Sequence, residues 1–517
     1  MMKKITSALL LAAMLITSLA ACGKPGNTSN DTTTTTPNNQ VTGEPTAEVT
    51  TVAETENPYD ENGYLKDELP EDLNLNGETV NVYIADYNSA YAVDMYAEQL
   101  TGDRLKDTVY NVTASVEDRL HVDLAYRTKQ FVWADFTNFQ TEVTTEILSG
   151  TTSFDLLFGV HHYAAQMVSN TYFADLSKTP HVDLTKPWYN QTILNTVMPT
   201  DYISFVAGSF SLVNIKSAFS MYYNADLYAS LGHTENLIET VKAGKWTREK
   251  LETLIADSYA DLDGDNVADP TDRYGLTFGD WNKYCCFPAA FDIEIVGRDE
   301  ENNFVCRFDS ERTVDAVSFL CSLIHDNPNT LMALSSGAAG AESYMVDSGG
   351  GNRVSKPFMD GNAIFTFSLV GDAATISPNV EFNFGILPTP KWDETQENYQ
   401  TSLQRSCYAL IPTTVKNETA AGAVLEAIAS ETYRTLVPEY CEVMLKTRYS
   451  NSQDVSDMYT LILDSIIFDP GVEYSQIIGA PTDTFRASLA NNSPNWASTI
   501  KGTMHVINKK LATLIPD

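Results

Sequence analysis

An aspartate-rich stretch at residues 261–272 carries the sharpest chemical signal in the sequence. Carboxylates fall at positions 1, 3, 5, 9 and 12 of this stretch, from Asp261, Asp263, Asp265, Asp269 and Asp272. A calcium loop takes oxygen ligands at these positions and a backbone carbonyl at position 7, which belongs to Val267. Gly264 stands at position 4 instead of 6, so Asn266 must make the tight left-handed turn. We therefore predict a Ca²⁺ site, with a plain acidic turn as the alternative.

The other residue types that could do chemistry give weaker signals. The six cysteines beyond Cys22 form no C-x-x-C pair, and the seven histidines add no metal-ligand spacing to them. Buried free thiols are favoured, and a disulfide between Cys306 and Cys285 or Cys286 is the alternative. No G-x-S-x-G, H-E-x-x-H or G-x-G-x-x-G motif occurs, although 68 acidic residues leave a catalytic carboxylate pair open.

The N-terminus has the parts of a bacterial lipoprotein signal. Lys3 and Lys4 precede an apolar stretch that is too short for a permanent membrane span, and small residues lead directly to Cys22. We predict that residues 1–21 are a signal peptide and that Cys22 is acylated, with palmitate among its chains. The protein would then be anchored to the outer face of the cell membrane. An ordinary signal peptide with a chance cysteine is the alternative.

Composition separates a tether from a folded body. Residues 22–75 comprise the lipidated Cys22 and a flexible linker rich in Thr, Asn and Pro, which cannot form a core. The rest is long enough for two domains, at 43% hydrophobic residues over the whole chain. The formal net charge is −35 and no basic cluster offsets it, so nucleic acid and acidic lipid are poor partners.

The first part of the body alternates strands and helices. Residues 78–85, 122–126 and 154–160 are predicted strands, and residues 105–120 and 136–148 place apolar side chains on one helical face. This order predicts an open α/β sheet with parallel pairing through right-handed crossovers. Ligands of such sheets bind beyond the carboxyl ends of the strands.

The second part begins near residue 220. Thr247 is predicted to cap a helix that carries Leu251, Leu254 and Ile255 on its apolar face. Strands are expected at residues 274–278, 361–367 and 382–388, and helices at 313–324, 420–429 and 459–466.

Several short motifs follow one another in the order seen in a known family. They are FDLLF at 154–158 with FADL at 173–176, YYNADL at 222–227, GKWT at 244–247 with RYGL at 273–276, DGNA at 360–363, and FGILPTP at 384–390. Behind a lipobox, this set resembles the extracellular solute-binding lipoproteins of ATP-binding-cassette (ABC) importers, in the maltose-binding-protein-like branch called family 1. The resemblance spans about residues 78–500.

The resemblance implies a two-lobed periplasmic-binding-protein-like fold of type II. Each lobe would be an open, mainly parallel sheet flanked by helices, in the α/β class. The N-terminal lobe would comprise residues 76–218 and 380–435, and the C-terminal lobe residues 219–379 and 436–517. Crossings between the lobes are implied near residues 219–224 and 382–388. In this family an Asp-rich loop of the kind at 261–272 holds a structural ion.

The resemblance also points to loops after particular strands as the solute site. Flat aromatic faces and planar polar groups suit a sugar, and these loops offer both. The implied ligand-binding residues are Tyr87, His162, Tyr163, Trp281, Tyr284 and Ser368, with Trp281 the first choice. Trp188 and Trp246 resemble structural positions, while Trp133 and Trp496 are undecided.

The leading hypothesis is a non-catalytic receptor, a monomer that closes its lobes on a carbohydrate or oligosaccharide and delivers it to ABC permease subunits in the membrane. The alternatives are a surface glycoside-active enzyme and a glycan-binding or sensor lipoprotein without a transport role. The identity of the solute does not follow from the sequence.

Overall fold

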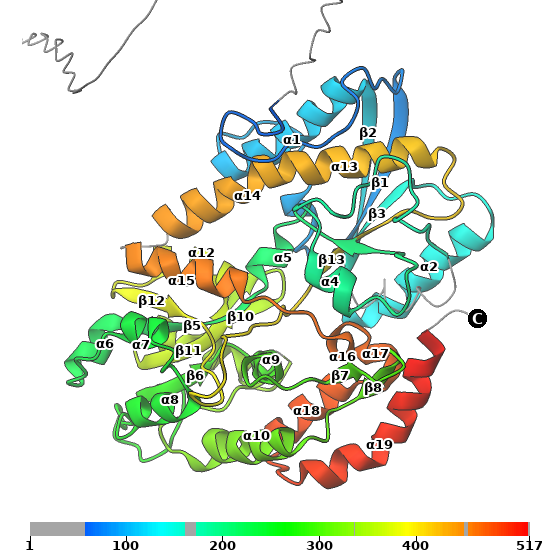
Figure 1. Cartoon of the computed structure of the whole chain (residues 1–517). Helices are drawn as coiled ribbons and strands as arrows, with labels where there is room; N and C mark the ends of the chain where they lie inside the picture. The colour runs from blue at the N-terminus through cyan, green and yellow to red at the C-terminus, as the bar shows by residue number, and fades with distance from the viewer. Residues whose placement is uncertain (1–56, 161–171, 336, 449–452, 515–517) are drawn as a thin grey trace, which may run out of the picture. The chain divides into compact units, whose positions relative to one another are not determined.

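Two separate β-sheets organise the part of the chain that the computed structural model describes, residues 57–160, 172–335, 337–448 and 453–514 (Figure 1). Cys22 and the predicted signal peptide, residues 1–21, lie outside the described residues, as do His162 and Tyr163. Two short hairpins, β9–β10 and β7–β8, accompany the sheets. Among the described residues, none of the helices is both long and apolar enough to cross a membrane.

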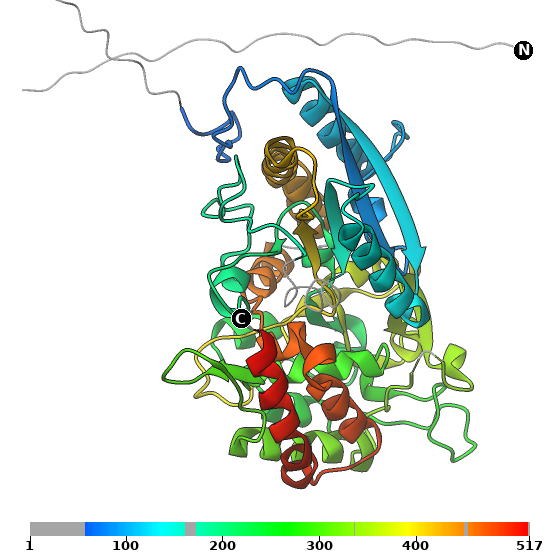
Figure 2. The same ribbon diagram turned by 90° about the vertical axis from the view of Figure 1, so that its right-hand side faces the viewer.

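The first sheet has the strand order β2-β1-β3-β13-β4. Its strands are β1 (Glu78–Tyr87), β2 (Val122–Phe131), β3 (Leu156–Val160), β4 (Val206–Ala207) and β13 (Cys407–Leu410). β1 pairs with β2 and β3 in parallel, as predicted, whereas β13 runs antiparallel to β3 and β4. In Figure 2 the long strands β1 and β2, blue and cyan, run side by side. This sheet and the helices packed on it are called the first lobe.

The second sheet has the order β12-β5-β11-β6. Its strands are β5 (Phe219–Asn224), β6 (Tyr274–Phe278), β11 (Ala363–Leu369) and β12 (Phe384–Leu387). Only the β11–β6 pair is parallel in this sheet, because β5 enters from the first lobe and runs against both of its neighbours. The sheet is open as expected, but it is not the mainly parallel sheet that we expected for this lobe. The hairpin strands are β7 (Val296–Arg298), β8 (Phe304–Cys306), β9 (Met345–Gly349) and β10 (Asn352–Ser355). The second sheet and its helices are called the second lobe.

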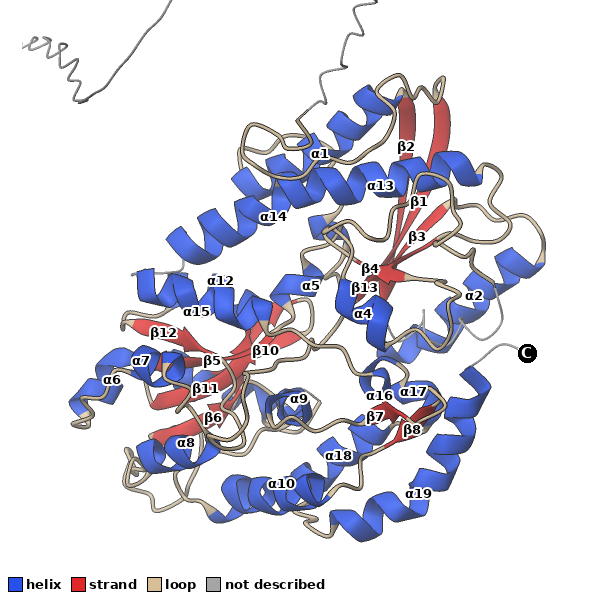
Figure 3. Cartoon of the chain, viewed as in Figure 1, coloured by secondary structure: helices blue, strands red, loops and turns tan. Residues whose placement is uncertain are grey.

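The helices cover the sheets as the apolar periodicity requires (Figure 3). α1 (Arg104–Leu120) buries Val109, Val112, Val116 and Leu120, which are the spaced residues of the sequence pattern. The further helices of the first lobe are α2 (Phe136–Leu148), α4 (Gln191–Thr196), α5 (Val213–Lys216), α13 (Glu418–Arg434) and α14 (Leu436–Pro438).

The helices of the second lobe are also placed as their apolar periodicity requires. Thr247 caps α8 (Arg248–Ile255) by accepting a hydrogen bond from the Lys250 amide at 3.3 Å, as predicted. The others are α6 (Ala225–Ser230), α7 (Leu237–Lys242), α9 (Phe287–Ala290), α10 (Glu311–Cys321), α11 (Lys356–Met359), α12 (Ala373–Asn379), α15 (Gln453–Asp464), α16 (Pro470–Glu473), α17 (Ser475–Ile478), α18 (Pro481–Ala490) and α19 (Trp496–Leu511).

The chain crosses between the two sheets at neighbouring places. Ala218, just before β5, forms an isolated bridge with Leu403, and Thr401 forms another with Ile466. Because β12 belongs to the second sheet, the return crossing lies between Leu387 and Cys407. Residues 384–387, which we expected in the first lobe, are therefore part of the second. The strand itself was predicted, but the sequence does not tell which sheet it joins. Conversely, α14, which we expected in the second lobe, packs on α13 and α1 of the first.

The cysteines are unpaired throughout the described chain. Cys286, Cys306, Cys321 and Cys407 are buried, and Cys285 and Cys441 are partly buried. Burial raises the pKa of the Cys407 thiol to about 12, so it stays protonated at neutral pH. These thiols behave as small apolar side chains, which is the interpretation that the sequence favoured.

Candidate functional site

A cavity of about 600 Å³ lies where the two lobes and the crossing segment meet. The first lobe contributes the residues that follow β1 and β2, the second lobe contributes the 3₁₀ helix Trp281–Cys286 and part of α18, and residues 402–405 of the crossing lie between them. This volume lies within the range of small-molecule sites in proteins. The cavity is therefore the candidate binding site.

The first-lobe wall is formed by two turns at the carboxyl ends of parallel strands. Tyr87 ends β1, and its ring lies 5.6 Å from that of Phe131 at the end of β2. Asn88 follows with a φ of 52°, a left-handed conformation that asparagine tolerates. The buried carboxylate of Asp86 holds this turn by accepting the amides of Tyr91 and Ala92 at 2.9 and 3.1 Å.

Trp133 is a cavity residue that the sequence analysis left undecided. The second strand was predicted to end near residue 126, but β2 continues to Phe131, so residues 132–134 lie at its carboxyl end. The Trp133 side chain is 49% exposed and its ring lies 5.2 Å from that of Phe136. A tryptophan face at the rim of a cavity is well suited to contact the C–H surface of a sugar.

The second-lobe wall is built around Trp281. Its helix is capped at the N-terminus by Asp280, whose carboxylate accepts the Asn282 amide at 2.9 Å. The guanidinium of Arg486, from α18, lies 4.2 Å from the centre of the Trp281 ring and is ion-paired with Asp483 at 3.0 Å. Arg486 also donates to the Asn282 side chain. Trp281 is thus held in place on one side and lines the cavity, as expected for a platform.

Arg405 is the most buried charged residue of the cavity lining. It belongs to the crossing segment, is 5% exposed, and its guanidinium lies 5.8 Å from the centre of the Tyr87 ring. Its terminal nitrogens donate to the Gly350 carbonyl and to Asn352 Oδ1, the latter at 2.7 Å. No sequence pattern marks this residue, because the crossing segment has no regular structure of its own.

Two of the predicted ligand contacts lie elsewhere. Tyr284 is fully buried, packs edge-on against Phe278, and accepts the Ala333 amide at 3.1 Å through its hydroxyl. Ser368 is also fully buried, and its hydroxyl donates at 2.5 Å to Asp372. Neither lines the cavity, so both predictions need correction. Tyr284 follows β6 as expected, whereas Ser368 lies within β11, which continues to Leu369. Both side chains turn into the core of the second lobe.

The remaining predicted contacts divide into two groups. Tyr87 and Trp281 line the cavity together, although they are almost 200 positions apart in sequence. The predictions for His162 and Tyr163 fall outside the described residues. Trp188, Trp246 and Trp496 are fully buried, which agrees with structural roles for the first two.

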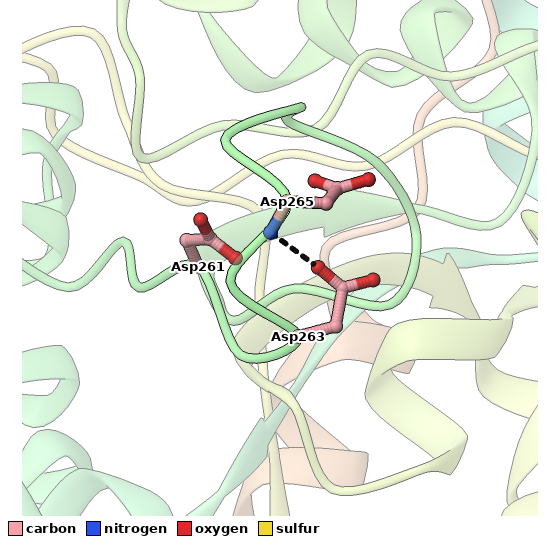
Figure 4. Close-up of side chains that lie close together, drawn as sticks. All are labelled: Asp261, Asp263 and Asp265. Atoms are coloured by element: carbon pink, nitrogen blue, oxygen red, sulfur yellow. Dashed lines mark hydrogen bonds between the residues drawn. The ribbon is translucent and has the colours of Figure 1, made fainter.

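The aspartate-rich stretch forms an exposed turn away from the cavity (Figure 4). One carboxylate oxygen each from Asp261, Asp263 and Asp265 can be chosen so that all lie within 4.8 Å of one another. Asn266 has a φ of 63°, so it makes the left-handed turn that the spacing required. The Asp261 carboxylate accepts the amides of Gly264 and Asn266, and these bonds lower its pKa.

The two later carboxylates of this stretch do not join that group. Asp272 is fully buried and accepts hydrogen bonds from the Tyr259 hydroxyl and the Leu262 amide at 3.0 and 2.9 Å. Asp269 accepts the amide and hydroxyl of Thr271, both at 2.7 Å. Val267 is exposed. In this geometry Asp269 and Asp272 shape the turn, whereas we had expected both as ligands.

Comparison with known proteins supports the fold. The sugar-binding protein MalE from Xanthomonas citri has a TM-score of 0.55 at 11% identity, over 84% of this chain and 97% of that chain. The cyclic α-maltosyl-1,6-maltose binding protein from Arthrobacter globiformis has a TM-score of 0.54 at 13% identity, over 84% and 99%. An ABC substrate-binding protein from Listeria monocytogenes, in complex with cycloalternan, has a TM-score of 0.53 at 14% identity, over 84% and 99%.

At these identities the likeness defines the fold. The chain has the α/β, two-lobed periplasmic-binding-protein-like fold of the maltose-binding-protein type, as the sequence predicted. No protein-family model matches the chain, and no curated protein matches its sequence.

Proposed function

We propose that the chain is a non-catalytic solute-binding receptor that holds a carbohydrate between its two lobes. The observation that carries this proposal is the cavity of about 600 Å³, in which Tyr87, Trp133 and Trp281 are combined with Asn and Arg side chains. Aromatic faces contact the C–H surfaces of a sugar, and amide or guanidinium groups bond its hydroxyls. The fold supports the same assignment, because the sugar-binding protein MalE and the cyclic α-maltosyl-1,6-maltose binding protein share it.

Lobe closure would complete the site. Walls from both lobes line the cavity, and the crossing segments at Ala218–Phe219 and 388–406 are two of the places where the lobes can rotate. Closure on a solute is favoured only when the closed state makes contacts that the open state lacks. Tyr87 of the first lobe and Trp281 of the second would supply such contacts from opposite sides.

The cellular setting follows from the sequence. We propose that Cys22 is acylated after removal of residues 1–21 and that the linker to residue 75 holds the receptor at the outer face of the cell membrane. The partner would be the permease subunits of an ABC importer, with the receptor acting as a monomer. Replacing Cys22 by Ala should release the protein from the membrane, whereas retention would contradict the anchor.

A thermal-shift screen of the purified protein tests the receptor function directly. Mono- and oligosaccharides should include a ligand that raises the melting temperature, because a ligand that binds only the native state stabilises it by mass action. Trp281→Ala should abolish this shift, while Trp392→Ala, a tryptophan outside the cavity, should leave it in place. Turnover of the glycan by the wild-type protein would contradict a non-catalytic role.

We also propose that Asp261, Asp263 and Asp265 hold a structural Ca²⁺ ion. Three carboxylates close together give the dense set of hard oxygen ligands that Ca²⁺ takes, and the Val267 carbonyl is the further ligand that the spacing predicts. The ion would tie the turn after α8 to β6 without reaching the cavity. Calorimetric titration of chelator-treated protein with CaCl₂ tests this, and the absence of heat would leave the stretch as an acidic turn.

A further inference from the structure

Arg405 is a buried cation whose hydrogen-bond partners are all neutral. Its terminal nitrogens donate to the Gly350 carbonyl and to the amide oxygen of Asn352, and no carboxylate of the described chain lies within the 4.0 Å ion-pair distance. Transfer of a charge out of water costs several kcal/mol unless an opposite charge compensates it. The Arg405 guanidinium, which is 5% exposed on the cavity wall, therefore lacks a compensating negative charge.

A second buried cation lies behind it in the same network. Lys283 is fully buried, and its ammonium donates to Gln404 Oε1 at 3.1 Å. The amide nitrogen of Gln404 donates to Asn352 Oδ1 at 3.2 Å, the same oxygen that accepts from Arg405. Two cations are thus joined through two neutral amides. Lys283 forms no ion pair within the described chain either, although Asp280 caps the helix that carries it.

The charge of the cavity lining is opposite to that of the protein. The described lining includes Arg353, Arg405 and Arg486 against one carboxylate, Asp483, in a chain with 68 acidic and 33 basic residues. Arg486 is paired with Asp483, and Arg353 with the exposed Asp347 at 3.1 Å. Arg405 is left as the uncompensated cation. The cavity lining is therefore electrostatically complementary to a negatively charged group on the solute.

We propose that the cavity takes an acidic saccharide, with the carboxylate or another anionic group of the sugar paired to Arg405. This inference rests on the proposed receptor function and specifies its substrate class. A planar guanidinium held by two hydrogen bonds presents its remaining edge in a fixed direction, which suits a bidentate anion. The Lys283–Gln404–Asn352 chain orients that edge and adds positive potential. Tyr87 and Trp281 contact the sugar ring, and Arg405 forms an ion pair with its anionic group.

Matched pairs of ligands test the inference on the purified protein. Thermal shift and titration calorimetry compare trigalacturonate with galactotriose, and glucose 6-phosphate with glucose, with inorganic phosphate alone as the anion control. We expect the acidic member of a pair to bind at least about tenfold more tightly, because a charge-assisted contact is stronger than a neutral one. We also expect that advantage to shrink as the salt concentration rises.

Three variants separate recognition from folding. Arg405→Gln should remove the preference for the acidic member, and Arg405→Lys should keep part of it. Arg248→Gln, whose guanidinium stacks on Trp392 at 3.8 Å outside the cavity, should leave the preference intact. The comparison of ligand pairs on the wild-type protein does not depend on how well any variant folds.

Each of the other experimental outcomes would contradict a specific part of the proposal. Neutral sugars that bind as tightly as acidic ones, with no effect of Arg405→Gln, overturn the substrate class and leave the receptor in place. An equal shift from inorganic phosphate alone overturns the saccharide part of the inference. No shift with either member of any pair, when the wider screen finds a neutral sugar that binds, overturns the inference alone. The receptor function is overturned only when the wider screen of mono- and oligosaccharides also yields no ligand.

Discussion

We expect the buried carboxyl of Glu473 to make the stability of the protein depend on pH. Glu473 belongs to α16, is 3% exposed, and accepts a hydrogen bond from the hydroxyl of Tyr408 on β13 of the first sheet. Burial is the main cause that raises the pKa of Glu473 from 4.5 to about 7, and the Tyr408 bond partly opposes it. The folded protein therefore favours the protonated, neutral form of the Glu473 carboxyl over the charged form.

The sign and size of the effect follow from this difference in pKa. A carboxyl whose pKa is raised on folding stabilises the native state below its unfolded pKa, and that stabilisation is lost as the pH rises through about 7. Between about pH 5 and about pH 8.5 the loss is about 2 to 3 kcal/mol. At about 1 kcal/mol/K of unfolding entropy for ~460 residues, this corresponds to about 2 to 3 °C in melting temperature.

Glu473→Gln should remove this contribution, because the amide is neutral at every pH and still accepts from Tyr408. The measurement is the melting temperature of wild type and variant by calorimetry at about pH 5, 7 and 8.5. We expect the variant to gain about 2 to 3 °C relative to wild type as the pH rises. Glu301→Gln, at an exposed position, is the matched control. Parallel pH profiles for wild type and Glu473→Gln would show that Glu473 does not cause the pH dependence.

Three further predictions concern packing, the ion and the site. Trp246→Ala should destabilise the protein by about 3 to 5 kcal/mol in denaturant unfolding. The substitution empties a fully buried position and leaves the Pro388 carbonyl without the indole N–H that donates to it at 2.8 Å. A loss of stability below about 1 kcal/mol would contradict this prediction. Asp261→Asn should weaken Ca²⁺ binding at least about tenfold by calorimetry, whereas Glu301→Gln should not. Trp133→Ala should weaken sugar binding without lowering the melting temperature of the free protein, because the side chain is 49% exposed; an unchanged dissociation constant would remove Trp133 from the site.

The regular elements could be predicted because their periodicity is strong. The spacing of Val109, Val112 and Val116 defines one face of α1, and that face is buried against the first sheet. The cap at Thr247 and the left-handed turn at Asn266 follow from local chemistry alone. These features depend on interactions within a few residues, which a sequence shows directly.

The residues of the cavity were harder to predict from the sequence, because its walls come from segments that are far apart in the chain. Tyr87 and Trp281 were predicted from their positions after strands, and both line the cavity. Tyr284 was chosen by the same rule, but a 3₁₀ helix follows β6, and only some of its side chains turn toward the cavity. Arg405 lies in a crossing segment without periodicity, so nothing local distinguishes it from an ordinary surface arginine.

We infer that the cavity between the lobes holds a saccharide. A crystal structure of the protein, soaked or grown with the sugar that raises the melting temperature most, tests it most directly. We expect an intact sugar against the Trp281 and Tyr87 rings, with its anionic group at the Arg405 guanidinium. A sugar bound at another surface, or a hydrolysed product in the cavity, would contradict the account.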